Sequence, residues 1–167
     1  MDADSIVNAW FDKKRTQIDP NKASTSDMSA DAIVDGYFAK KSGKSPNPLD
    51  DTAVTNAISN VGSQEYNDLC ERFAETQVLG THGLYPDAAT AWNNYVSQGK
   101  AYSGDKAPSG ALVYFKPDSS NGGNGHVGIS DGNGNIVAAT SNGVKFTPIS
   151  SWTKQTGQSM LGYAIPK

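Results

Sequence analysis

The chain has 167 residues with a formal net charge of −3, and its Lys and Arg residues form no cluster larger than Lys13–Arg15. This composition excludes the basic surface of a nucleic-acid-binding protein, and no apolar run reaches the roughly 18 residues that a membrane span requires. A single cysteine excludes an internal disulfide, and with only two histidines it also excludes the usual multi-ligand zinc site, so we expect no cofactor.

Two similar 11-residue segments occupy much of the first 49 residues. Asp4–Lys14 reads DSIVNAWFDKK and Asp31–Lys41 reads DAIVDGYFAKK. Each has apolar residues at roughly helical spacing, Asp at its start and a Lys pair at its end, which predicts a short amphipathic helix. Two interpretations stay open: the helices cover each other or the main domain, or they form a duplicated recognition unit with Trp10 and Tyr37 as equivalent contacts.

A stretch rich in Ser, Pro and Gly, SGKSPNPL (42–49), follows these segments and is typical of a connector. We therefore predict a helical N-terminal region over residues 1–49 and a larger domain over residues 50–167. The larger part has the usual size of one compact domain.

Two of the helices predicted in this domain cover 51–61 and 86–98. Asp87 follows Pro86 at the start of the second, and Gly99 is placed to end it. The spacing puts Trp92 and Val96 on one face of that helix, together with Ala88 and Ala89.

A third helix, between these two, is predicted over Asp68–Leu79, and it carries the only cysteine. Asp68 is a natural N-cap with Glu71 three residues later, and Gly80 is placed to end the helix. Cys70 lies near the start of the helix, on the inward face that also includes Phe73, Ala74, Gln77 and Val78.

From Gly110 the pattern changes to short β-type runs separated by turn signals. The runs are GALVYF, HVGIS, NIVAAT, GVKFTPI and LGYAIP, and Asp131-Gly132 and Asn142-Gly143 are typical of hairpin turns. Helices that precede an antiparallel sheet of about five strands predict an α+β fold rather than a doubly wound one.

Cys70 is the candidate nucleophile. A cysteine attacks as its thiolate, and the unpaired N–H groups and dipole at a helix start stabilise that anion. The negative charge of Asp68, close to the thiol, is expected to oppose this ionisation. The alternative is an ordinary buried thiol, which is the commoner role of a lone cysteine.

Two histidines compete for the role of the base. His82 follows the far end of the Cys70 helix, about 15 Å from Cys70 at a rise of roughly 1.5 Å per residue, so it is the poorer candidate. His126 opens a predicted strand, and Gly125 and Gly128 leave room there for a helix end to approach. A cysteine on a helix facing a histidine on a strand is the arrangement of papain-like nucleophilic catalysis, whereas a single strand histidine can also be structural.

Three stretches carry a resemblance to a known family: Cys70 in LCERFAE, the strand SGALVYF (109–115) and above all GHVGISDGNGNIVAAT (125–140). They are similar to the NlpC/P60 and CHAP group of papain-like cell-wall cysteine peptidases and amidases, over about residues 58–167. The resemblance implies a papain-like fold, Cys70 as nucleophile and His126 as base. It further implies hydrolysis of a peptidoglycan stem-peptide amide through an acyl-enzyme, with backbone N–H groups near Cys70 as oxyanion donors.

Two positions depart from the pattern of that family. The Asp-Cys-Ser-Gly around its nucleophile is LCER at residues 69–72, so the substrate contacts of that motif do not carry over. The third residue, which orients the histidine, would fall near Ala138, which has no polar side chain. Thr140 on the same strand face, or Asn142 at the following turn, is the candidate replacement, with a water or a main-chain carbonyl as the alternative.

We therefore expect a cysteine hydrolase of peptidoglycan, an endopeptidase or an amidase, with Tyr66 and Trp92 as candidate substrate-binding residues; Trp92 can equally be a core residue. A non-catalytic wall-binding or virion-structural module on the same fold, and an acyltransferase or deamidase of the same scaffold, stay open. The start, MDADSIVNAW, lacks the basic and apolar pattern of a secretion signal. We expect delivery to the wall by phage lysis, in a virion or by a secretion system, with the N-terminal helices contacting other proteins of that assembly.

Overall fold

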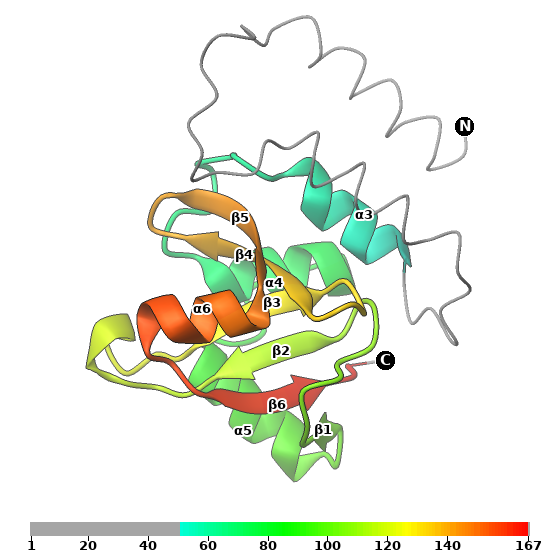
Figure 1. Cartoon of the computed structure of the whole chain (residues 1–167). Helices are drawn as coiled ribbons and strands as arrows, with labels where there is room; N and C mark the ends of the chain where they lie inside the picture. Colours follow the sequence, from blue (N-terminus) through cyan, green and yellow to red (C-terminus); the bar gives the residue numbers. More distant parts are fainter. Residues whose placement is uncertain (1–50, 167) are drawn as a thin grey trace, which may run out of the picture. The chain divides into compact units, whose positions relative to one another are not determined.

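The computed structural model describes residues 51–166, in which helices pack on both faces of a six-stranded antiparallel sheet (Figure 1). The sheet has the strand order β1-β6-β2-β3-β4-β5. The helices are α3 (Asp51–Ser59), α4 (Cys70–Leu79), α5 (Ala88–Ser97) and α6 (Ile149–Thr156), with a short 3-10 helix at Ser119–Asn121. The strands are β1 (Ala101–Tyr102), β2 (Leu112–Phe115), β3 (His126–Ser130), β4 (Asn135–Thr140), β5 (Gly143–Pro148) and β6 (Met160–Ala164).

The predicted α+β class and the order of helices before sheet are confirmed by this architecture. Within residues 51–166, no helix combines the length and the apolar character needed to span a lipid bilayer. The duplicated segments Asp4–Lys14 and Asp31–Lys41 lie outside the described residues, so the N-terminal helices and the division near residue 49 stay predictions.

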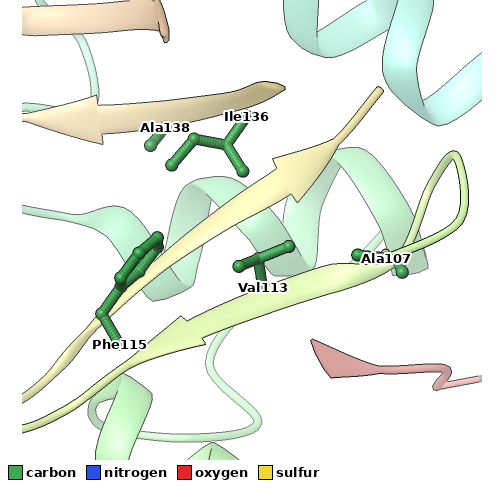
Figure 2. Close-up of a cluster of buried hydrophobic side chains, with 6 residues drawn as sticks. Ala107, Val113, Phe115, Ile136 and Ala138 are labelled. Carbon is green, nitrogen blue, oxygen red and sulfur yellow. The ribbon is translucent and has the colours of Figure 1, made fainter. Parts of the chain in front are cut away.

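Both faces of the central strands are buried, because successive side chains of a strand point to opposite sides and each side is covered. On one face, a buried cluster includes Val113 and Phe115 of β2 with Ile136 and Ala138 of β4 (Figure 2). Trp152 of α6 packs against this cluster. Figure 1 shows α6 lying across this face, with α4 and α5 on the other side of the sheet.

The opposite face of the sheet packs against α4 and α5. Tyr114, fully buried on β2, has its ring 5.5 Å from that of Trp92 and 6.2 Å from that of Tyr95, both on α5. Phe73 of α4 is also fully buried. Burying a side chain of this size stabilises the fold by roughly 1.5–3 kcal/mol, so these contacts fix α4 and α5 on the sheet.

Helix α4 begins at Cys70, two residues later than predicted. Its N-cap is Leu69, without a capping side chain, so the prediction of Asp68 as N-cap was wrong. Asp68 instead adopts a left-handed conformation with φ 60°, and its N–H donates to the carbonyl of Thr140 on β4. This tertiary hydrogen bond fixes the backbone before the helix to the sheet, and no side chain caps the first turn. The predicted end is confirmed, since Gly80 is left-handed with φ 70°.

Helix α5 is confirmed, with Asp87 as its N-cap and Gly99 just beyond its end, but its predicted face is confirmed only in part. The buried residues are Ala88, Ala91 and Tyr95, whereas Val96 is 52% exposed. Trp92 of the predicted face packs against Tyr114 of β2, and Tyr95, which apolar spacing did not place on that face, contacts the same ring.

Two elements were not predicted, α6 and β1. Helix α6 directly follows β5, so the apolar residues at the end of one element and the start of the next read as one strand. Strand β1 has only two residues, Ala101 and Tyr102, and exists through pairing with Ala164 and Tyr163 of β6. Such a strand has no local periodicity to detect.

Candidate active site

The start of α4 lies beside the first residues of β3, the strand that begins at His126. Regular β3–β4 pairing includes only Ile129 and Ser130 on the β3 side. Beyond it, the Val127 N–H donates to the sulfur of Cys70. Because the N–H groups of a strand point within the plane of the sheet, the thiol lies at the edge of the β3 backbone, one residue from His126.

The segment before α4 is fixed to the hairpin that joins β4 and β5. The Asp68 N–H donates to the Thr140 carbonyl at 3.4 Å, and Asn67 Oδ1 accepts from the Gly143 N–H at 2.8 Å. The chain that leads to Cys70 is thus held by β4 and β5, while the thiol itself contacts β3. The cysteine is positioned by the sheet as much as by its own helix.

Replacing Gly143 with Ala is expected to disturb this anchor. The new Cβ would lie 2.6 Å from Gln64 Nε2 and 3.1 Å from the Ser63 carbonyl, which already accepts from the Val144 N–H. A matched control is Gly134→Ala, because Gly134 has a similar φ of +86° against +89° but nothing within 4 Å of its Cβ.

Both variants incur the cost of about 1–2 kcal/mol for a left-handed non-glycine residue. Only Gly143→Ala adds a steric cost of about 1–3 kcal/mol. Urea unfolding measures the loss of unfolding free energy in each variant. Equal losses in the two variants would contradict the anchoring of residues 63–68 by the hairpin.

His126 is 8% exposed, and aromatic rings surround it. Its ring centroid lies 4.3 Å from that of Trp152 with an interplanar angle of 12°, a face-to-face stack, and 6.1 Å from that of Phe115. Burial lowers the pKa of the imidazole to about 4. The His126 Nε2 atom is buried and has no hydrogen-bond partner among the described residues. At neutral pH the ring is therefore an uncharged base.

The thiol of Cys70 rests in its protonated form. Burial raises its pKa to about 11, although the N–H groups of Val127, Glu71 and Cys70 itself act in the opposite direction. The carboxyl group that opposes ionisation is Glu71, not Asp68 as the sequence predicted. The helix start supplies donors to the sulfur, but the loss of hydration outweighs them.

Glu71, next to the nucleophile, is a buried carboxyl group with one unpartnered oxygen. The Tyr114 hydroxyl donates to its Oε1 at 3.4 Å, whereas Oε2 has no hydrogen-bond partner in the described part of the chain. Burial, followed by the charge of Glu75, raises the pKa of Glu71 to about 8. At pH 7 the group is mostly protonated, so its effect on the ionisation of Cys70 is weak until the pH exceeds about 8.

Glu71 also predicts a pH dependence of stability. Its folded pKa of about 8 is raised above the ordinary 4.5, so the folded state holds a proton that the unfolded state releases. Below about pH 4.5 the shifted pKa of Glu71 leaves the free energy of unfolding unchanged. As the pH rises toward about 8, it lowers the free energy of unfolding increasingly.

Glu71→Gln should remove this part of the pH dependence. Between about pH 4.5 and about pH 8, the free energy of unfolding of the variant should rise relative to that of the wild type by on the order of 1–3 kcal/mol. Urea unfolding across the range measures the gain, with Glu65→Gln at an exposed position as control. Parallel pH curves for wild type and Glu71→Gln would contradict the account.

Thr140 and Asn142, the predicted replacements for the third residue, belong to the β4–β5 turn. The Thr140 hydroxyl donates to the Gly143 carbonyl at 2.8 Å and accepts from the Asn142 N–H at 3.1 Å. In residues 51–166 no hydrogen bond joins either side chain to His126. An orienting role for either residue stays a prediction.

The other candidates have described contacts with residues outside this pair. Tyr66 packs edge-on against Phe73 with centroids 5.1 Å apart, and Trp92 packs against Tyr114, so their contact with a substrate stays a prediction. His82 is exposed in the loop after α4, at the opposite end of the helix from Cys70. No group of three or more His, Cys, Asp or Glu residues within 51–166 has an arrangement suited to a metal ion.

Trp152 is the site residue that the sequence did not reveal. It lies on α6, which was not predicted, and 26 positions separate it from His126. The spacing of Ile149 and Trp152, three residues apart, is a helical signal that a shorter predicted β5 would have exposed. Its contact with the imidazole is tertiary and leaves no pattern in the sequence.

In a comparison with protein families, residues 62–160 match the model described as NlpC/P60 family. The matched range includes Cys70, His126 and Trp152. It covers more than half of the 167 residues. No curated protein matches the chain.

Proposed function

Because the chain belongs to the NlpC/P60 family of cell-wall cysteine peptidases and hydrolases, we propose that it hydrolyses an amide bond of the peptidoglycan stem peptide. Cys70 is the nucleophile of this proposal and His126 is the base. The observation that carries it is the hydrogen bond to the Cys70 sulfur, at the start of α4, from the backbone N–H of Val127, the residue that follows His126.

In the proposed first step, the Cys70 sulfur attacks the carbonyl carbon of the scissile amide while its proton passes to His126. A carbon–sulfur bond forms and the carbonyl π electrons move to the oxygen. The backbone N–H groups of Cys70 and Glu71, in the first turn of α4, are the proposed donors to this oxyanion. When the tetrahedral intermediate collapses, the carbon–nitrogen bond breaks and His126 returns the proton to the leaving amine.

In the second step, His126 takes a proton from water as the water attacks the thioester. The carbon–sulfur bond breaks and the proton on His126 passes to the sulfur. The products are the free thiol and a carboxylic acid, which releases its own proton to water. The raised pKa of Cys70 and the lowered pKa of His126 favour a neutral resting pair, so the proton moves during attack rather than before it. The pair is not hydrogen-bonded in the described structure, and such contacts often tighten only with substrate.

This neutral pair predicts the acid side of the pH–rate profile. Activity requires an unprotonated His126, so kcat/KM should fall only as the pH drops toward about 4, and no loss is expected near neutral pH. Measurement of kcat/KM on a soluble muropeptide from acid to mildly alkaline pH tests this, with the values assigned to the Cys–His pair as a unit. An acid limb near the ordinary imidazole value of about 6.5 would contradict the buried ring.

The substrate assignment is tested with defined muropeptides. Purified full-length chain is incubated with each, and mass spectrometry identifies the new termini. Cleavage between two amino acids identifies an endopeptidase, and cleavage between the sugar lactyl group and L-alanine identifies an amidase. An acyl transfer product or a deamidated peptide would favour the acyltransferase or deamidase, and intact substrate under all conditions would contradict hydrolysis. Delivery by lysis, a virion or a secretion system remains a prediction.

A non-catalytic wall-binding module is the second candidate, favoured by the unpartnered Nε2 of His126 and the raised pKa of Cys70. Slow alkylation of the thiol is expected in both cases, because the resting cysteine is protonated, so reactivity alone does not separate them. Co-sedimentation with purified sacculi without release of fragments, unchanged in Cys70→Ser, would favour the module. Release of fragments by the wild type alone would favour the hydrolase.

A further inference from the structure

We propose that Trp152 is a positioning residue for His126, holding the plane of the imidazole by stacking where a polar third residue is missing. This inference rests on the proposed role of His126 as the base. It assigns a function to α6, an element whose residues contribute no group to the chemistry itself.

The geometry of the two rings supports this role. Their centroids are 4.3 Å apart and their planes differ by 12°, so the indole covers one face of the imidazole. The other aromatic pairs in residues 51–166 have centroids between 5.1 and 6.2 Å apart. A rotation of the imidazole about its Cβ–Cγ bond would break this close contact, so the stack resists that rotation.

The polar side of the ring offers no such restraint. The His126 Nε2 atom is buried without a hydrogen-bond partner in the described structure. Ala138, near which the resemblance to the family places the orienting residue, is fully buried in the apolar cluster. The Thr140 hydroxyl is engaged within its own turn. Stacking is therefore the closest described contact that acts on the orientation of the ring.

Trp152 is itself held by a short polar chain. Its Nε1 donates to Gln158 Oε1 at 3.2 Å, and Gln158 Nε2 donates to Ser120 Oγ at 3.2 Å. Gln158 is 5% exposed, and the ring of Phe115 packs against Trp152 at a tilt of 52°, with the two centroids 6.0 Å apart. An anchored indole can impose its plane on the ring that it covers.

The test compares Trp152→Met, which keeps apolar volume but removes the ring face, with Trp152→Phe, which restores an aromatic face. Tyr102→Leu is the matched control, because it breaks another stacked pair, Tyr102 with Tyr163 at 5.5 Å and 18°, that has no described contact with His126. Thermal unfolding checks that each variant is folded. The steady-state constants on a soluble muropeptide and the NMR titration of the histidine ring protons are then measured, with His82→Gln used to assign the two histidines.

Trp152→Met should lower kcat by about 10-fold or more with KM changed by less than about 2-fold, because a misaligned base affects the chemical step. Its His126 titration should also move upward, since water reaches the uncovered ring. Trp152→Phe should recover most of kcat, and Tyr102→Leu should change neither quantity. A folded Trp152→Met with wild-type kcat and titration would overturn the proposal, as would a folded Trp152→Phe with the full loss of kcat.

The NMR titration separates this inference from the proposed function, because it needs no activity. If the wild type hydrolyses no muropeptide, a His126 titration that moves in Trp152→Met and not in Tyr102→Leu still supports control of the ring by Trp152. An unchanged titration in Trp152→Met overturns it.

Discussion

Cys70→Ala is expected to lower kcat/KM on a muropeptide by about 10⁴-fold or more, because the variant cannot form the acyl-enzyme. The chain contains one cysteine, so no second thiol can replace it. The fold should survive, since the residue lies at the first position of α4 and Ala is well tolerated there. Product formation followed by chromatography measures the loss.

Cys70→Ser is the companion variant, because it keeps a nucleophilic atom at the same place. We expect it to be nearly as inactive as Cys70→Ala, since the neutral His126 is a weak base toward a hydroxyl. Undiminished product formation by either variant would show that the thiol is not the nucleophile. A large change in unfolding temperature would instead point to a packing role.

His126→Gln should have an effect of similar size, about 10³- to 10⁴-fold on kcat/KM, because the resting thiol of Cys70 has a raised pKa and needs a base during attack. The loss should be mainly in kcat. The double variant Cys70→Ala/His126→Gln should be no less active than Cys70→Ala alone, because residues that act as one unit are not additive.

His82→Gln is the matched control for this prediction. His82 is exposed beyond the end of α4, while Cys70 begins that helix. Activity within about 2-fold of the wild type is expected, as for surface substitutions away from a site. A comparable loss in both histidine variants would contradict the assignment of His126 as the base.

The local elements of this domain could be predicted because their signals are local. Asp87 and Gly99 delimit α5, Gly80 ends α4, and the β3 and β4 runs have the apolar, β-branched composition of buried strands. The candidate pair followed from the same reasoning, since a cysteine at a helix start and a histidine at a strand start are visible in sequence.

The errors share a physical origin in contacts between residues far apart in the chain. Asp68 was predicted as a cap, but its N–H bonds to Thr140 on the sheet. The helix start was expected to favour a thiolate at Cys70, but burial by the surrounding strands raises the pKa instead. Trp152 and Glu71 acquire their importance only when β3 brings His126 to the first and β2 brings Tyr114 to the second. No window of sequence contains these neighbours.

The most direct test of the account is to capture the acyl-enzyme. The wild-type chain is mixed with an excess of a defined muropeptide, quenched with acid before steady state, and digested for peptide mass spectrometry. Because Cys70 is the only cysteine, a thioester can form at one position only. The account predicts an adduct on the peptide that contains Cys70, with the mass of the acyl half of the substrate, and no adduct in Cys70→Ala. Product formation by Cys70→Ala at the wild-type rate, or an acyl adduct on another residue, would contradict it.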